Sequence, residues 1–120
     1  MHEIGIAASI LEAIRSEGAL HRCARPVRAG VRIGELAGVD PESLRFCFET
    51  LANDTDLAHL KLEIEICARR HHCPVCRAEF AVSGYDFRCP ACGREATEFM
   101  SGDQLEFAYL EVEEYEPASA

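Results

Sequence analysis

The sequence lacks any long hydrophobic run. Apolar residues make up 48% of its 120 residues, yet no stretch approaches the roughly 20 consecutive apolar residues that a membrane-spanning helix needs. The N-terminus also lacks a basic segment followed by an apolar run and a small-residue cleavage site, the pattern of a secretory signal. We therefore expect a soluble protein of the cytoplasm with no membrane partner.

Positive charge is also scarce. The 12 lysine and arginine residues face 21 aspartate and glutamate residues, which gives a formal net charge of -9. Proteins that bind nucleic acid normally present a basic surface, so we expect no nucleic acid partner. Two local groups of basic residues, the arginines between Arg22 and Arg32 and the pair Arg69-Arg70, are the features that argue in the other direction.

The seven cysteines do not suit a disulfide framework, because their number is odd and cytosolic thiols stay reduced. Four of them form two CxxC motifs, Cys73-Pro74-Val75-Cys76 and Cys89-Pro90-Ala91-Cys92. Each motif presents two sulfurs from one tight turn, and two such turns supply the four ligands of a tetrahedral zinc ion. We predict a structural zinc site at Cys73, Cys76, Cys89 and Cys92.

Two other uses of the same cysteines stay open, namely a pair of thioredoxin-like redox motifs and an iron-sulfur cluster. The surrounding segment favours zinc, because residues 71–100 contain few aliphatic residues and cannot form a hydrophobic core of their own. Zinc binding is worth about 10 to 16 kcal/mol in short peptides, which is enough to hold such a segment together. Four thiolate ligands leave no open position for hydrolytic chemistry.

Apolar periodicity predicts two helices. Helical spacing runs from residue 4 to about residue 20, with Ile4, Ala7, Ile10 and Ile14 on one face. The second helix spans residues 41–52, because Asp40 is a good cap and a proline follows it in the first helical position.

Alternating apolar and polar residues predict strands at residues 27–33 and 60–66, the second with Leu60, Leu62, Ile64 and Ile66 facing inward. A third strand follows at residues 105–112, and its change of phase after Phe107 would be explained by a β-bulge. We expect the second and third strands to pair, with the cysteine-rich segment inserted at the tip of their hairpin.

The predicted fold is therefore α+β, a three-stranded sheet covered by two helices, with an inserted zinc-ribbon-like module. We place the α/β domain at residues 1–70, completed by a strand within 103–113, the zinc-binding domain at 71–101 and a flexible acidic tail at 114–120.

The chain starts Met1-His2-Glu3. A bulky second residue is expected to prevent removal of Met1, so that its α-amine stands beside the His2 imidazole and the Glu3 carboxylate. Such a compact, nitrogen-rich donor set favours square-planar Ni(II) or Cu(II) over tetrahedral zinc. Protons compete for these donors, so binding should depend on pH. The alternative is that His2 is simply an exposed histidine.

Taken together, these features resemble the HypA/HybF family of hydrogenase nickel-incorporation proteins. The resemblance covers essentially the whole chain. It depends on Met1-His2-Glu3 at the start of a helix, Ile33-Gly34-Glu35 at the end of a strand, Ser43-Leu44-Arg45-Phe46-Cys47-Phe48-Glu49 on the second helix, and the paired CxxC motifs.

The resemblance implies a nickel metallochaperone that is not an enzyme. It implies a transient nickel site at the N-terminus, formed by His2 with the backbone nitrogens of the first residues, and a structural zinc site at the four cysteines. In some family members a carboxylate at the start of the second helix joins the nickel ligands, and Asp40 occupies that place here. Asp40 is equally well explained as a plain helix cap.

The resemblance also implies partners: a hydrogenase accessory GTPase, the [NiFe]-hydrogenase large subunit and possibly urease accessory proteins. We expect a monomer or a weak homodimer. The contrasting hypothesis is a zinc-ribbon interaction module in transcription or RNA processing, in which arginines of the cysteine-rich segment contact phosphates.

Three residues near these motifs receive structural explanations. We expect His71 and His72 to be solvated linker residues, and Cys47 to be a small core residue of the second helix.

Overall fold

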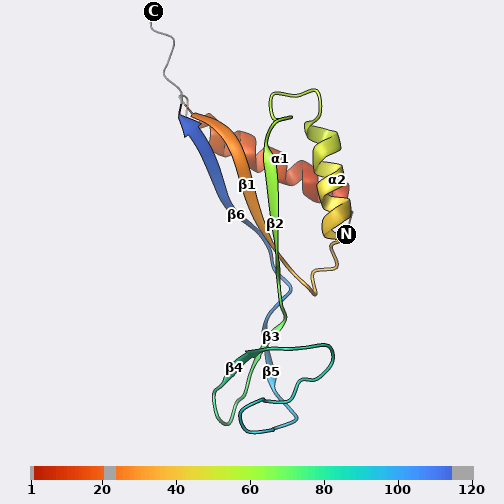
Figure 1. Ribbon diagram of the computed structural model, residues 1–120, viewed down its shortest axis with the longest axis vertical. Helices are drawn as coiled ribbons and strands as arrows, with labels where there is room; N and C mark the ends of the chain where they lie inside the picture. The colour runs from red at the N-terminus through yellow and green to blue at the C-terminus, as the bar shows by residue number, and fades with distance from the viewer. Residues whose placement is uncertain (1, 21–23, 115–120) are drawn as a thin grey trace, which may run out of the picture.

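The computed structural model describes residues 2–20 and 24–114. This part of the chain forms two helices and two three-stranded sheets, which confirms the predicted α+β class (Figure 1). No helix within the described ranges is long and apolar enough to cross a membrane.

The larger sheet is centred on β1 (Ala24–Gly34) and has the order β2-β1-β6. Strand β2 (Lys61–Cys67) runs parallel to β1, and β6 (Leu105–Glu114) runs antiparallel to it on the other side. The predicted hairpin is therefore wrong, because β2 and β6 are separated by β1. The physical reason is α2 (Pro41–Ala52), which connects β1 to β2 as the crossover that parallel neighbours require.

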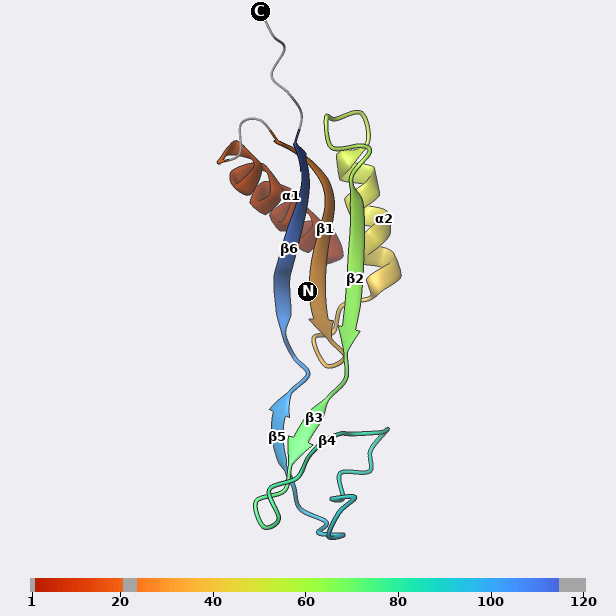
Figure 2. The same ribbon diagram turned by 60° about the vertical axis from the view of Figure 1, so that its left-hand side comes forward.

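Both helices lie on one face of this sheet (Figure 2). Helix α1 (Glu3–Ala19) contacts β1 and β6, and α2 contacts β2. The prediction that Ile4 faces the core is wrong, because Ile4 is exposed while Ile6 is buried. Ile66 pairs with Ile33 and so lies on the helix-covered face as predicted, but at the end of β2 it is 49% exposed. In Figure 1 that end of β2 extends past both helices, so nothing covers it. The core consists of Ile6, Ala7, Ile10, Ile14, Ala29, Val31, Ile33, Leu44, Phe48, Ala52, Leu57, Leu60 and Leu62.

The opposite face of the sheet is polar. Arg28 donates to the Glu63 carboxylate at 2.9 Å, and Arg32 donates to Glu65 at 3.0 Å. The predicted bulge in β6 is confirmed, because the register shifts where Gly30 pairs with Tyr109 and Val31 with Phe107. Strand β6 runs to Glu114, so the predicted tail begins too early, and residues 115–120 lie outside the described part of the chain.

The smaller sheet lies beyond the end of the larger one and has the order β4-β3-β5. Its strands are β3 (Arg70–His72), β4 (Glu79–Ala81) and β5 (Glu98–Ser101), and β3 pairs antiparallel with both neighbours. The two CxxC motifs lie in the loops of this sheet. The sheet therefore carries the cysteine-rich segment as a separate module.

A short neck connects the two sheets and uses the turn that follows β1. The backbone N–H of Leu36 donates to the Gly102 carbonyl at 2.7 Å, and the N–H of Arg69 donates to the Glu35 carboxylate at 2.8 Å. A Cβ on Gly34 would lie 2.1 Å from the Gly102 carbonyl oxygen. The close packing of Gly34 against Gly102 explains why glycine follows Ile33.

Candidate metal centres

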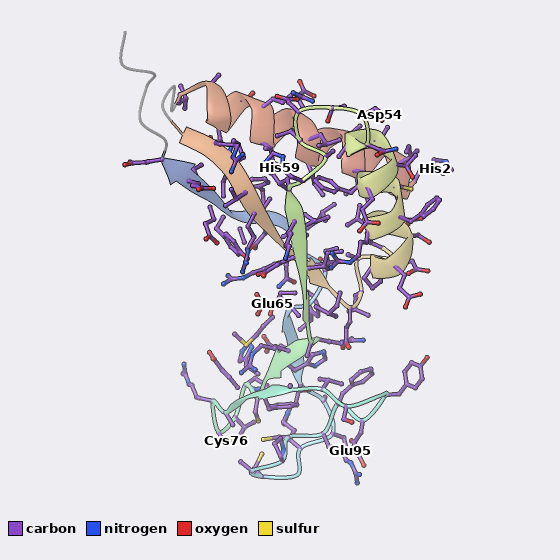
Figure 3. The ribbon with its side chains drawn as sticks, turned by 45° about the horizontal axis from the view of Figure 1, so that its top comes forward. His2, Asp54, His59, Glu65, Cys76 and Glu95 are labelled. Atoms are coloured by element: carbon purple, nitrogen blue, oxygen red, sulfur yellow. The ribbon has the colours of Figure 1, made fainter. Side chains whose placement is uncertain are left out.

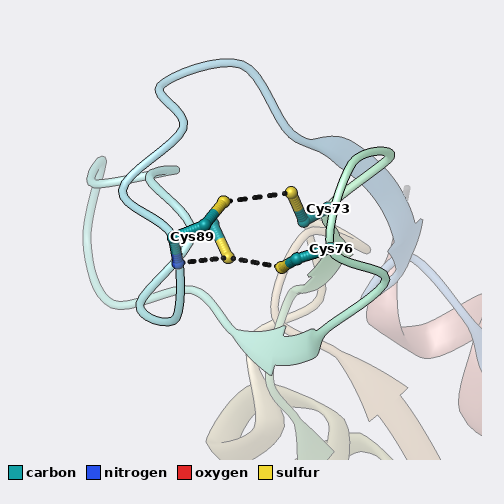
Figure 4. A group of neighbouring side chains, drawn as sticks. Cys73, Cys76 and Cys89 are labelled. Carbon is teal, nitrogen blue, oxygen red and sulfur yellow. Dashed lines mark hydrogen bonds between the residues drawn. The ribbon is translucent and has the colours of Figure 1, made fainter.

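The four cysteines of the two CxxC motifs come together at the end of the smaller module (Figure 4). The sulfur of Cys73 lies 3.6 Å from that of Cys92, and the sulfur of Cys76 lies 3.5 Å from that of Cys89. All four sulfurs are within 4.8 Å of one another. A tetrahedral zinc ion with bonds of about 2.3 Å would place its sulfur ligands about 3.8 Å apart. The cluster therefore fits a structural zinc site.

The two motifs have the same backbone geometry. In the first, the N–H of Arg77 donates to the Cys73 carbonyl at 2.9 Å, and in the second Gly93 donates to Cys89 at the same distance. Both donors have positive φ, 67° at Arg77 and 79° at Gly93. This left-handed conformation lets each chain turn sharply behind its second cysteine, which aims both sulfurs of a motif in one direction.

Backbone hydrogen bonds favour ionisation of two of the four sulfurs, those of Cys73 and Cys89. The N–H of Cys76, aided by that of Val75, lowers the pKa of Cys73 to about 6, and the N–H of Cys92 lowers the pKa of Cys89. Although the N–H of Ala78 favours its thiolate, the pKa of Cys76 is raised to about 11 by its hydrogen bond with Cys89 and by burial. Without a metal ion, hydrogen bonds between the sulfurs thus keep part of the cluster protonated. A bound divalent cation supplies the charge that keeps all four ionised.

Contrary to the expectation that residues 71–100 have no core of their own, a small aromatic core built around His71 supports the cysteine cluster. The prediction that His71 is a solvated linker residue is wrong, since it is only 3% exposed. Its ring stacks on Phe87 at a centroid distance of 5.2 Å and meets the edge of Phe99. Aromatic residues at Phe80, Phe87 and Phe99 were the signal in the sequence that a small core exists here, and they converge from separate segments of the module.

The hydrogen bonds of His71 define its neutral form. Arg69 donates from Nε to His71 Nε2 at 2.9 Å, so the ring proton lies on Nδ1, 3.0 Å from Thr97 Oγ1. Burial lowers the pKa of His71, and the charge of Arg69 acts in the same direction. His72 is half-buried, with its ring 3.5 Å from the Glu98 carboxylate. Neither histidine joins the sulfur cluster, whose members are all cysteines.

The described candidates for nickel binding belong to the larger domain, where Figure 3 labels His2 apart from the cysteine module. His2 is the N-cap of α1, and its exposed side chain makes no capping hydrogen bond. Glu3 begins the first turn and is half-buried, whereas Met1 lies outside the described residues. The donor atoms of His2, Glu3 and Asp40 do not form a second side-chain cluster within the described part of the chain.

Asp40 caps α2. Its carboxylate accepts from the N–H of Glu42 at 3.0 Å and from that of Ser43 at 3.4 Å. These bonds satisfy two of the four free N–H groups at the helix start. The predicted structural role of Asp40 is thus confirmed, and its role toward nickel stays a prediction.

One feature near His2 had no signal in the sequence. An apolar groove of about 580 Å³ lies between α1 and β6, and His2 lines one part of it. The groove depends on the pairing of β6 with β1, which is the part of the topology that the sequence did not reveal.

The fold and the cysteine cluster define a two-module α+β protein that carries a structural metal site beside its larger sheet. Residues 1–112 match the family described as hydrogenase/urease nickel incorporation, metallochaperone, hypA. The chain therefore belongs to this family of nickel metallochaperones, as the resemblance implied.

Relatives and solved structures agree with this assignment. The hydrogenase maturation factor HypA of Geotalea uraniireducens is 38% identical over 113 residues, which is 94% of this chain and 100% of the relative. That of Chlorobaculum parvum is 30% identical over the same shares of both chains. The solution structure of the Ni metallochaperone HypA from Helicobacter pylori covers 92% of this chain and 97% of its own, with a TM-score of 0.60 and 21% identity. This last likeness concerns the fold.

Proposed function

We propose that this chain binds Ni(II) at its N-terminus and delivers it during the maturation of [NiFe]-hydrogenase, and possibly also of urease. The observation that carries the proposal is the position of His2. Its imidazole is exposed and not used as a helix cap, and it stands next to the first backbone nitrogens of the chain. It can therefore meet a metal ion without any rearrangement of α1.

The proposed donors are the α-amine of Met1, the imidazole of His2, the backbone amides between them and the Glu3 carboxylate, with Asp40 as a further carboxylate. A nitrogen-rich set of this kind suits Ni(II) better than the soft sulfur cluster does. Because the site is exposed, nickel can leave when a partner offers better ligands. The sulfur cluster stays filled with zinc throughout and stabilises the module that carries it.

The proposed recipients are the accessory GTPase and the large subunit of [NiFe]-hydrogenase, with urease accessory proteins as a second route. We place these encounters in the cytoplasm and propose that the chain meets them as a monomer or a weak homodimer. The family assignment does not favour the contrasting hypothesis of a nucleic-acid-binding zinc ribbon.

The first prediction concerns His2 and is tested by nickel titration with calorimetric detection. The wild-type protein should bind Ni(II) with a dissociation constant on the order of micromolar, and His2→Ala should abolish this binding because it removes the imidazole donor. Zinc content, measured by elemental analysis, should not change. A Gly-Ser extension before Met1 should also weaken binding, since it moves the α-amine away from His2.

His59→Ala is the matched control, because His59 is exposed on the same domain and its ring forms a hydrogen bond with the Pro26 carbonyl at 3.1 Å. Unchanged nickel affinity in His2→Ala would refute the N-terminal site. Equal losses in His2→Ala and His59→Ala would point to unspecific binding by surface histidines.

A further inference from the structure

The outer edge of β6 is available for pairing. Strand β6 is the last strand of the larger sheet, and no described strand pairs with its outer side (Figure 2). Its ten residues present a row of backbone N–H and carbonyl groups on that side. Such an edge is a template for another extended segment.

The face of β6 that points toward the helices is apolar and incompletely covered. Phe107 pairs with Val31 and Leu105 with Ile33, so their side chains share the helix-covered face of the sheet. They are nevertheless 36% and 40% exposed. They line the groove between α1 and β6, together with Ile6, Ile10 and His2. An extended segment on the edge would direct every second side chain toward this groove.

The opposite face of β6 is acidic. Glu106 pairs with Arg32 in the register, yet Arg32 forms its ion pair with Glu65, and Glu106 has no ion-pair partner within residues 2–20 and 24–114. Glu111 shares Arg28 with Glu63. The remaining side chains of a segment on the edge would therefore meet uncompensated negative charge.

The same charges oppose a second copy as the occupant. An antiparallel pair of β6 strands that keeps both apolar faces on one side sets glutamates of the acidic face against each other, for example Glu106 against Glu111 when Leu105 lies opposite Val112. Like charges directly opposite each other destabilise a strand pair.

We propose that the β6 edge docks an extended segment of a partner protein in which apolar side chains alternate with lysine or arginine. The apolar side chains would enter the groove and the basic ones would pair with Glu106 and its neighbours. Because His2 lines the groove, this docking would bring the partner beside the nickel donors. Only this link to nickel transfer depends on the proposed function.

A labelled peptide tests the docking in the absence of nickel. The probe has ten residues, the length of β6, and alternates valine with lysine. A peptide of the same composition in two blocks, and one that alternates valine with glutamate, are the peptide controls. Of the three peptides, only the alternating valine-lysine peptide should bind when measured by fluorescence anisotropy at low salt. Added salt should weaken this binding.

Two variants locate the site. Phe107→Asp should weaken binding about tenfold because it places a charge in the groove, and Glu106→Lys should do so by about threefold to tenfold through charge reversal on the opposite face. Ile66→Asp, an exposed apolar position on the other edge strand, is the matched control and should bind as the wild type does. Zinc content and circular dichroism show whether each variant folds. If Phe107→Asp does not fold, Glu106→Lys still tests the docking proposal.

Hydrogen exchange gives the geometry. Bound peptide should slow exchange at the β6 amides that point away from β1. Absence of binding at low salt, or equal binding by wild type and both β6 variants, would overturn the proposal. Self-association by sedimentation that Phe107→Asp abolishes would also overturn it, in favour of a second copy as the occupant.

The nickel proposal and the docking proposal can be refuted independently. Peptide binding that persists in His2→Ala, together with nickel binding that persists in Phe107→Asp, is expected if both hold. Loss of nickel binding in the wild-type titration would refute the proposed nickel site and leave the docking measurement intact.

Discussion

Gly30 makes room for a side chain that crosses the polar face of the larger sheet. A Cβ at this position would lie 2.0 Å from Cε1 of Tyr109, whose ring lies directly over the glycine. The hydroxyl of Tyr109 donates to Glu63 on β2. Tyr109 therefore spans the sheet from one edge strand to the other, and it can do so only because β1 has no side chain there.

We expect Gly30→Ala to lower the free energy of unfolding by about 1 to 3 kcal/mol, because the added methyl group must displace the Tyr109 ring. Urea denaturation of the zinc-loaded protein measures this. Gly5→Ala is the matched control: its Cβ would meet nothing within 4 Å, and it should stabilise α1 by up to about 1 kcal/mol. Equal effects of the two substitutions would contradict the close contact with Tyr109.

At the scale of elements, the start of α2 allows the observed structural role of Asp40 to be separated from its proposed role toward nickel. Its first turn depends on the Asp40 carboxylate, which two backbone N–H groups share. A carboxamide can accept the same hydrogen bonds without carrying charge. Asparagine therefore separates the cap from the proposed nickel ligand.

We predict that Asp40→Ala lowers the free energy of unfolding by about 1 kcal/mol, whereas Asp40→Asn changes it by only a few tenths. Thermal denaturation followed by circular dichroism measures both. If Asp40 also contributes a ligand, as proposed, Asp40→Asn should weaken nickel binding in the titration. Full nickel affinity in Asp40→Asn would restrict Asp40 to its structural role.

The sequence predicted those elements whose signals are local. The bounds of α2 were right because cap, proline and apolar spacing all lie within the helix itself. The grouping of the four cysteines was predicted correctly because each CxxC turn supplies two sulfurs on its own. The phase change at Phe107 correctly indicated a bulge.

The errors concern contacts between distant segments. The place of β1 between β2 and β6 is decided by the crossover through α2, which strand patterns do not reveal. The burial of His71 comes from aromatic residues brought together by the loops of the module. The roles of His2, Glu3 and Asp40 toward nickel stay predictions, because a site formed by these residues would depend on a bound metal ion and on backbone donors.

At the scale of the whole molecule, the neck joins the two modules within residues 2–20 and 24–114. The turn at residues 34–36 bonds to both connecting segments: Glu35 accepts from the N–H of Arg69, and Leu36 donates to the Gly102 carbonyl. Each module has its own sheet, and the small core around His71 is separate from the core of the larger sheet. The modules should therefore lose structure separately.

We predict that Cys73→Ala abolishes zinc binding and unfolds the smaller module, while the larger sheet and both helices stay folded. Cys73 is fully buried and supplies one of four sulfurs, so its loss leaves the module with neither metal nor sufficient core. Amide exchange measured by NMR separates the two regions. Cys47→Ala, which removes a thiol outside the cluster, should retain zinc, and loss of all secondary structure in Cys73→Ala would contradict the independence of the modules.

The pairing of β1 with β6 nevertheless gives the zinc site an influence on a sheet that it does not touch. Strand β6 reaches β1 only after the chain has passed through residues 68–104, and the β3–β5 pair shortens that path. When the module unfolds, the path becomes a longer flexible loop. If its effective length doubles about three times, the entropic free-energy cost of closing it rises by roughly 2 kcal/mol. Chelation of zinc should thus lower the melting temperature of the larger domain without altering any contact within it.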